Sequence, residues 1–360
     1  MYKGTGISKD QLSDDGEPCI LYGELYTKYK SETIREVISK TNIDNTKLVR
    51  SKANDVIIPC SGETAEDIAT ARCVLNGNIL LGGDLNIIRL HGYDGAFMSY
   101  QLNGRRKYDI AKVAQGVSVV HLYGEHLKGV KTINPCLEEQ KKIAKLLSLL
   151  DERIATQNKI INKLQSLIKG IVDCTILRKE KNAIVGDVCS ISEQIRAEAN
   201  IDDIITVRLH GRGVCKSSAE NLQLGATPYY RRRAGQLIYG KQNFHNGAIG
   251  IVPQSLDNGI TSKDIPSFDI YDMKCNSVYL LAQLQSPQYY KPAEALTTGT
   301  GSKRLKEDTF LKMPIVLPDK KEQDKIATLI FRISANLDQA KRVLDLFSIQ
   351  KQYLLRQMFI

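Results

Sequence analysis

The chain has 360 residues, of which 42% are hydrophobic and 25% charged, and its formal net charge at pH 7 is +10. This length predicts two or three domains with cores of their own. No apolar run is long enough to span a membrane and the N-terminus lacks a signal-peptide core, so a cytoplasmic protein is expected. The eight cysteines form no C-x-x-C pair and do not cluster with the five histidines, which indicates reduced, mostly buried thiols and no metal site.

Residues 1–134 are rich in glycine and in short β-like runs. The pattern predicts strands at 55–58, 87–90 and 117–120 and a short helix at 109–114. The second variable region has a lead-in segment at 185–188, whereas this region starts within the first few residues of the chain. We therefore expect either a shortened first domain or a lead-in segment supplied from elsewhere in the fold.

A long helix is predicted next, at about 138–174. It begins after Pro135 and contains the run Glu139-Gln140-x-x-Ile143-Ala144. Its apolar residues recur at alternating spacings of four and three residues. This is the a/d seam of a coiled coil rather than the broader stripe of a helix lying on a globular core.

Residues 181–317 again combine glycines with short apolar runs, after a lead-in at 185–188. Strands are predicted at 204–207, 236–239 and 248–251, and a helix at 277–285. Both variable regions therefore predict small mixed α/β domains.

The last segment repeats the first helix at a constant offset, so that Pro318 corresponds to Pro135 and no gap interrupts the match. Pro318 leads into Glu322-Gln323-x-x-Ile326-Ala327 and a helix at about 321–359, whose start is marked by a capping pattern, Asp319 with Glu322. Matched seams favour antiparallel packing of the two helices and a pseudo-two-fold repeat. The predicted seam residues are Ile143, Leu147, Leu150, Ile154, Ile161, Leu164, Ile168, Ile326, Ile330, Ile333, Leu337, Leu344 and Phe347.

Basic clusters in each half make candidate DNA contacts. Arginine and lysine suit phosphates and guanine edges, and Gln and Asn suit adenine edges. The clusters are a turn in the first region, a glycine-rich turn near residue 300, and two further runs in the second region. The first-region turn is the nearest basic counterpart of the others, whereas the repeat offset matches Gly116 with Gly299 and Leu122 with Leu305. The candidates are Arg105, Arg106, Lys107, Arg231, Arg232, Arg233, Lys241, Gln242, Asn243, Lys303 and Arg304.

Motifs that would indicate an enzyme are incomplete. The run from Gly235 to Lys241 satisfies most of a phosphate-loop pattern, but Gln242 stands where Ser or Thr would ligate magnesium. The nuclease-like Glu139-Gln140-Lys141 lies at a helix start, and its repeat loses the lysine. We therefore expect a non-catalytic protein with no cofactor.

The duplicated signature resembles that of the DNA-specificity (S) subunits of type I restriction-modification systems. In that family a proline, Glu-Gln and Ile-Ala precede a long helix that ends near a Leu-Leu pair, here Leu354-Leu355. The opening run, residues 3–26, is also similar to the start of the family's first recognition domain.

The resemblance implies an α+β fold with two mixed α/β target-recognition domains, at 1–134 and 181–317, separated by antiparallel coiled-coil spacer helices at 135–180 and 318–360. Each domain would read one half of a bipartite site in double-stranded DNA. Two methyltransferase (M) subunits would dock on the helices, and motor-nuclease (R) subunits would join this restriction endonuclease and adenine-N6 methyltransferase complex. The alternatives are a two-domain protein-binding adaptor and a DNA-cleaving enzyme.

Overall fold

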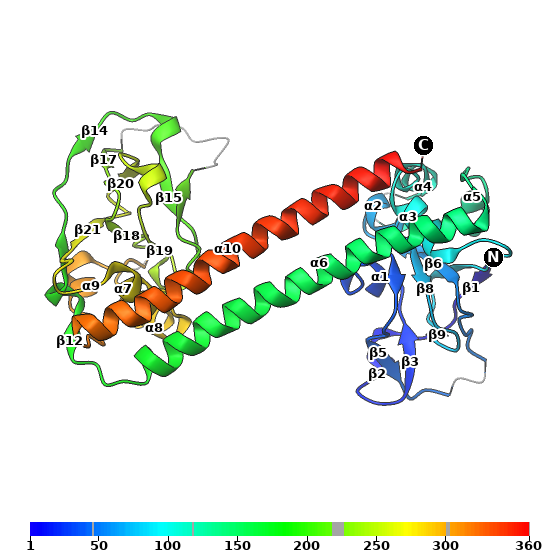
Figure 1. Cartoon of the computed structure of the whole chain (residues 1–360), viewed down its shortest axis with the longest axis horizontal. Coiled ribbons are helices and arrows are strands. Elements are labelled where there is room, and N and C mark those ends of the chain that lie inside the picture. Colours follow the sequence, from blue (N-terminus) through cyan, green and yellow to red (C-terminus); the bar gives the residue numbers. More distant parts are fainter. Residues whose placement is uncertain (45–46, 117–118, 218–226, 300–302, 360) are drawn as a thin grey trace. The chain divides into compact units, whose positions relative to one another are not determined.

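The computed structural model describes residues 1–44, 47–116, 119–217, 227–299 and 303–359. Two long helices, α6 (Leu137–Val172) and α10 (Lys320–Gln357), are its largest elements (Figure 1). The chain divides into two compact units: unit 1 comprises 1–159 and 341–360, and unit 2 comprises 160–340. Among the described residues, no helix is both long and apolar enough to cross a membrane.

Unit 1 is built on short, mostly antiparallel strands. One sheet has the order β1-β10-β6-β8-β4, a second has the order β2-β5-β3-β9, and β11 pairs with β7. The strands are β1 (Tyr2–Lys3), β2 (Leu12–Ser13), β3 (Glu17–Ile20), β4 (Thr33–Ile34), β5 (Ser39–Thr41), β6 (Asp55–Pro59), β7 (Ser61–Gly62), β8 (Arg72–Val74), β9 (Leu80–Leu81), β10 (Leu85–Ile88) and β11 (Val120–His121). The short helices are α1 (Glu24–Thr27), α2 (Ala65–Ile68), α3 (Gly95–Asn103), α4 (Lys107–Val113) and α5 (Gly124–Lys128).

Unit 2 has smaller sheets of the same antiparallel kind. Their orders are β13-β21-β18-β19 and β14-β17-β20, with pairs β15-β16 and β12-β22. The strands are β12 (Ala183–Ile184), β13 (Cys189–Ile191), β14 (Arg196–Ala197), β15 (Ile205–Val207), β16 (Val214–Lys216), β17 (Tyr229–Arg231), β18 (Leu237–Tyr239), β19 (Ile249–Ile251), β20 (Ile260–Ser262), β21 (Ser267–Ile270) and β22 (Pro314–Ile315). The helices are α7 (Ser277–Leu284), α8 (Pro287–Tyr290) and α9 (Glu307–Leu311).

The predicted α+β fold class is confirmed. The strands at 55–58, 204–207, 236–239 and 248–251 and the helices at 109–114 and 277–285 form close to the predicted positions. The strand predicted at 87–90 runs instead over 85–88, and part of the one predicted at 117–120 lies outside the described residues.

The two long helices pack antiparallel inside each unit. In unit 1, Ile143 and Leu147 of α6 share a cluster with Leu354 near the end of α10. In unit 2, Ile168 and Val172, near the end of α6, share a cluster with Ile326 near the start of α10. Every predicted seam residue is buried or half-buried, as two helices that shield one another require.

The buried glutamine of the repeated Glu-Gln signature ties each long helix to its domain. Gln140 is 1% exposed; its side-chain oxygen accepts from the backbone N–H of Asp94, and its amide donates to the carbonyl of Pro135. Gln323, also 1% exposed, makes the same two contacts with Asn276 and Pro318. Asp94 and Asn276 are the N-caps of α3 and α7, so the glutamine fixes a long helix against a capped domain helix.

The predicted capping pattern at the start of α10 is half-formed. Asp319 accepts from the backbone N–H of Glu322 at 2.8 Å, as an N-cap does. The Glu322 carboxylate does not return to the cap but binds the ammonium of Lys179.

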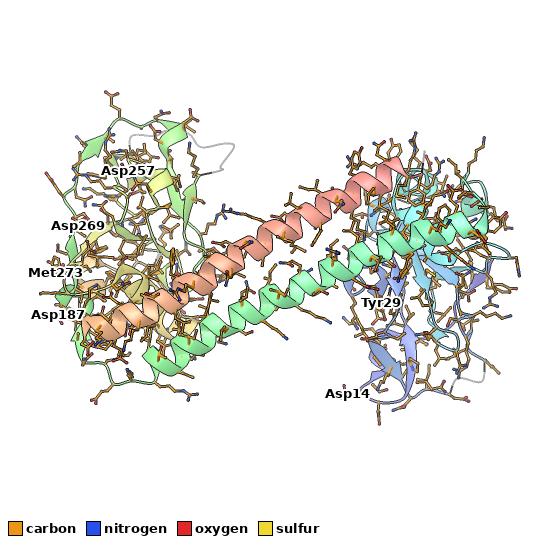
Figure 2. The ribbon with its side chains drawn as sticks, in the orientation of Figure 1. Asp14, Tyr29, Asp187, Asp257, Asp269 and Met273 are labelled. Carbon is orange, nitrogen blue, oxygen red and sulfur yellow. The ribbon has the colours of Figure 1, made fainter. Side chains whose placement is uncertain are left out.

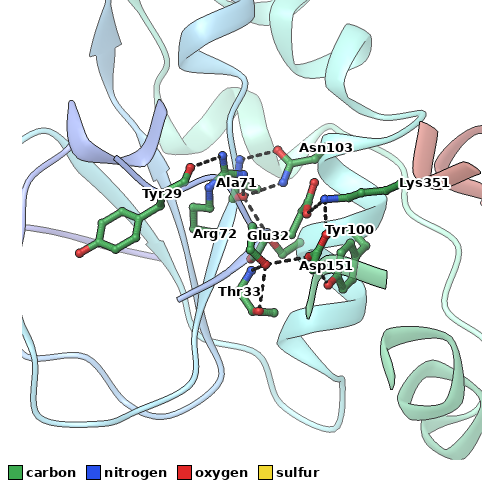
Figure 3. Close-up of polar contacts among 11 residues, drawn as sticks. Tyr29, Glu32, Thr33, Ala71, Arg72, Tyr100, Asn103, Asp151 and Lys351 are labelled. Atoms are coloured by element: carbon green, nitrogen blue, oxygen red, sulfur yellow. Dashed lines mark hydrogen bonds and ion pairs between the residues drawn. The ribbon is translucent and has the colours of Figure 1, made fainter. Parts of the chain in front are cut away.

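Unit 1 contains a buried network of charges where α10 meets α6 (Figure 3). The ammonium of Lys351 lies 2.5 Å from a carboxylate oxygen of Glu32 and 2.6 Å from one of Asp151. Asp151 also accepts from the hydroxyls of Tyr100 (2.8 Å) and Ser31 (2.7 Å). Burial raises the pKa of Glu32, and although burial alone would lower the pKa of Lys351, the two carboxylates hold it above its usual value.

Lys351→Met is expected to destabilise the protein by about 3–5 kcal/mol, because it leaves two buried carboxylates without their cation. Chemical denaturation monitored by circular dichroism measures the loss. The exposed Lys325 of the same helix provides the control, and Lys325→Met should change stability by no more than about 0.5 kcal/mol. Adding Glu32→Gln and Asp151→Asn to Lys351→Met should recover part of the loss; equal stability of Lys351→Met and wild type would contradict this account.

Candidate nucleic-acid interface

Three loops of unit 2 meet around Asp264 and bring together candidate residues that lie far apart in sequence. The backbone N–H of Lys241 donates to the Asp264 carbonyl at 2.9 Å, and the N–H of Leu305 donates to the Lys241 carbonyl at 2.9 Å. The Arg304 guanidinium reaches the Asp264 carboxylate at 3.3 Å. The turn after β18 and the residues before α9 therefore form one surface, which we call the Asp264 cluster: Lys241, Gln242, Asn243, Lys263, Asp264, Lys303 and Arg304.

Most side chains of this cluster are available to a ligand. Gln242, Asn243, Lys303 and Arg304 are exposed. The pairs Lys303–Glu294 (3.4 Å) and Arg304–Asp264 (3.3 Å) have both partners about half-exposed, so each contributes little and can be exchanged for a phosphate. Lys241 is less available to a ligand, because its side chain is only 17% exposed and its ammonium lies 2.6 Å from a carboxylate oxygen of Glu307.

Lys263 is a member of the cluster that the sequence prediction missed. It is exposed and directly precedes Asp264. Nothing around Lys263 in the sequence is rich in cations, so only the fold of the 262–265 loop reveals it. The Asp264 cluster thus has a fourth cation beside Lys241, Lys303 and Arg304.

The prediction that Arg232 contacts DNA is wrong. Its side chain is fully buried and donates to the hydroxyls of Thr261 (2.7 Å) and Ser267 (2.9 Å) and to the carbonyl of Ile265 (3.0 Å). Burial lowers the pKa of this guanidinium to about 10. The residue is the middle one of three arginines at the end of β17, where alternate side chains face opposite sides, and it holds the 261–267 segment in place.

Arg231 and Arg233 are exposed, but they lie apart from the Asp264 cluster. In the β17–β20 pair, Tyr229 is opposite Ser262 whereas Arg231 is opposite Ile260. The backbone N–H of Ala234 donates to Asp257. Asp257, labelled in Figure 2, lies at the end of unit 2 where Figure 1 labels β14, β17 and β20. Unit 2 therefore presents two separate groups of basic candidates.

In unit 1 the candidate cations lie at the turn between α3 and α4. Arg105 is exposed, while Arg106 and Lys107 are half-buried and Arg106 reaches Asp109 at 3.4 Å. A side chain on the preceding Gly104 would lie 2.7 Å from the Leu355 carbonyl oxygen. This turn thus packs against the C-terminal end of α10.

By position, the counterpart of the glycine-rich turn near residue 300 is not this turn but the chain around Gly116, and the match predicted from the repeat offset is confirmed. The bridge between Thr298 and Arg304 has its counterpart in unit 1 between Gln115 and His121, at the same offset that relates Pro135 to Pro318. The following glycines match as well, since Gly116 has φ 127° and Gly299 has φ 126°. The signal was present in the sequence as the matched spacing of these glycines.

The backbone around Asp84 in unit 1 repeats that of the Asp264 cluster with different side chains. The N–H of Cys60 donates to the Asp84 carbonyl at 2.7 Å, and the N–H of Leu122 donates to the Cys60 carbonyl at 2.8 Å. Gly83 stands at the position of Lys263, and His121 at that of Arg304. The two units therefore share this backbone framework of hydrogen bonds, but the side chains that it carries differ.

No group of three or more His, Cys, Asp or Glu residues that could hold a metal occurs in the described part of the chain. Four cysteines are buried, including Cys189, whose pKa burial raises to about 12, but Cys136 and Cys174 are exposed. The thiols are therefore less uniformly buried than the sequence predicted.

Comparison with known proteins assigns part of the chain to a family. Residues 3–166 match the family described as the type I restriction modification DNA specificity domain. Across 352 aligned residues the chain is 22% identical to the type I restriction enzyme MjaVIII specificity subunit of Methanocaldococcus jannaschii, covering 89% of this chain and 81% of that protein.

A solved structure shares the fold. The S subunit of a type I restriction-modification system from M. genitalium superposes with a TM-score of 0.66 at 14% identity, covering 100% of this chain and 93% of that one. The resemblance predicted from the duplicated signature is confirmed: residues 3–166 belong to the type I restriction-modification DNA specificity domain family, and the chain as a whole is similar to its specificity subunits.

Proposed function

We propose that this chain is the DNA-specificity subunit of a type I restriction-modification complex, and that the globular parts at 1–134 and 181–317 each read one half of a bipartite site. The observation that carries the proposal for unit 2 is the Asp264 cluster. Its exposed cations suit phosphates, and its exposed Gln242 and Asn243 suit adenine edges. Candidate contacts in unit 1 are Arg105 and the framework around Asp84.

Specificity subunits are the non-catalytic members of their complexes. In this proposal, methylation at adenine N6 and DNA cleavage come from two methyltransferase subunits and from motor-nuclease subunits, in the cytoplasm. The long helices support such docking, because large apolar side chains are exposed on their outer faces; side chains project from both helices in Figure 2. These exposed residues are Leu146, Leu149, Ile160, Leu167, Leu329, Phe331, Leu346, Ile349 and Tyr353.

The proposal is tested by DNA binding of the assembled methyltransferase complex as a function of salt. Lys263→Ala and Arg304→Ala should each weaken binding to all sequences and lower the slope of log K against log [salt] by about 1, because each removes a phosphate contact. Lys274→Ala, an exposed lysine of unit 2 outside the cluster, serves as the control and should leave the slope unchanged. Unaltered slopes for both cluster variants would remove the Asp264 cluster from the interface.

Replacing Arg231 or Arg232 by alanine should have different effects on stability and on DNA recognition. Arg232→Ala removes the buried donor to the hydroxyls of Thr261 and Ser267 and one of the two donors to the Ile265 carbonyl, which keeps its bond from Thr261, so a loss of at least about 2 kcal/mol is expected. Arg231→Ala removes an exposed side chain and should cost no more than about 0.5 kcal/mol, while weakening or relaxing recognition of one half-site. Thermal unfolding together with binding to site variants measures both; a stable Arg232→Ala with relaxed specificity would contradict the buried role.

A further inference from the structure

Unit 2 contains a cavity of about 570 Å³ where α7 faces the two long helices. Its apolar wall is formed by Ile168 and Val172 of α6, Ile330 of α10, and Leu281 and Ala282 of α7. Asp173, His210, Gln285 and Ser334 also line it. The cavity is open on one side, and its walls belong entirely to unit 2.

The same place in unit 1 is filled. Equivalent hydrogen bonds align α3 with α7, because Gln101 exchanges two hydrogen bonds with the backbone of Ile133 and Gln283 does so with Val316. Gln101 therefore corresponds to Gln283. The long helices are aligned in the same way by Gln140 and Gln323, whose contacts match.

With these alignments, Tyr100, Asp151 and Lys351 of the buried network in unit 1 correspond to Ala282, Ser334 and Ile168 of unit 2. All three counterparts line the cavity. The phenol ring of Tyr100 and the side chain of Lys351 fill the place in unit 1 (Figure 3). Smaller or uncharged residues at the same positions leave it open in unit 2.

We infer that this cavity receives an aromatic side chain, best a tyrosine, of a methyltransferase subunit docked on α6 and α10. This inference rests on the proposed function and adds a defined anchor to it. The occupant's chemistry follows from unit 1, where the fold places a phenol whose hydroxyl donates to a carboxylate. In the cavity, Asp173 offers such a carboxylate beside an apolar wall.

The surface around the cavity fits a protein partner. Leu167 and Phe331 are 51% and 64% exposed and directly adjoin the lining residues Ile168 and Ile330. An aromatic side chain buried in a pocket and ringed by further apolar contacts is the usual anchor of a protein interface. Because Tyr100 and Lys351 occupy the equivalent place in unit 1, the two methyltransferase subunits bind unequally, and the anchor strengthens only the one at unit 2.

Ala282→Tyr tests the inference, since it places in unit 2 the residue that unit 1 carries at the corresponding position. The control is Ala199→Tyr, which adds the same side chain at an exposed site of unit 2 outside the cavity and outside both long helices. Native mass spectrometry with the purified cognate methyltransferase subunit counts the bound copies, and titration gives their affinities. Wild type and Ala199→Tyr should bind two copies, and Ala282→Tyr should bind one of them at least tenfold more weakly.

Equal binding of both copies by Ala282→Tyr and wild type would overturn the inference while leaving the proposed function intact. Failure of wild type to bind any methyltransferase subunit would overturn the proposed function and the inference with it. If Ala282→Tyr does not fold, as judged by thermal unfolding, Ser334→Leu fills the same cavity from α10 and is expected to give the same loss.

Discussion

The antiparallel contact between α6 and α10 is the constraint on which the structure depends, because neither compact unit contains a whole long helix. Residues 137–159 and 341–357 belong to one unit, and 160–172 and 320–340 to the other. Each unit buries its share of the seam against its own domain helix, α3 or α7. Gln140 and Gln323 fix that contact with paired backbone hydrogen bonds.

Burial decides which charged side chains maintain the fold and which remain exposed to solvent. Arg232 and Lys351 are both cations within basic or helical runs, yet each is enclosed and bonded to buried acceptors. Removing either leaves partners that water cannot reach. Lys263, Lys303 and Arg304 are exposed, and the ion pairs of the last two are weak enough to be exchanged for a phosphate.

The long helices, their seam and most strands could be predicted from sequence because their signals are local and periodic. The Glu-Gln-x-x-Ile-Ala signature also indicated the family, although the reason for its glutamine became visible only in the contacts with Asp94 and Asn276. The site was harder to predict. The Asp264 cluster joins loops that are distant in sequence, from Lys241 to Arg304, and no local pattern distinguishes the buried Arg232 from its exposed neighbours. The repeat offset predicted the match of Gly116 with Gly299, and the equivalent bridges Gln115–His121 and Thr298–Arg304 confirm it.

We propose that the two variable regions read DNA separately, each on its own version of one framework. The most direct test is the methylated sequence produced in cells by a chimera in which residues 181–317 are replaced by the matching region of a related specificity subunit. Methylome sequencing should show one half of the bipartite site changed, with the other half and the spacing between them retained. A chimera that folds and assembles but alters both half-sites together would contradict the claim.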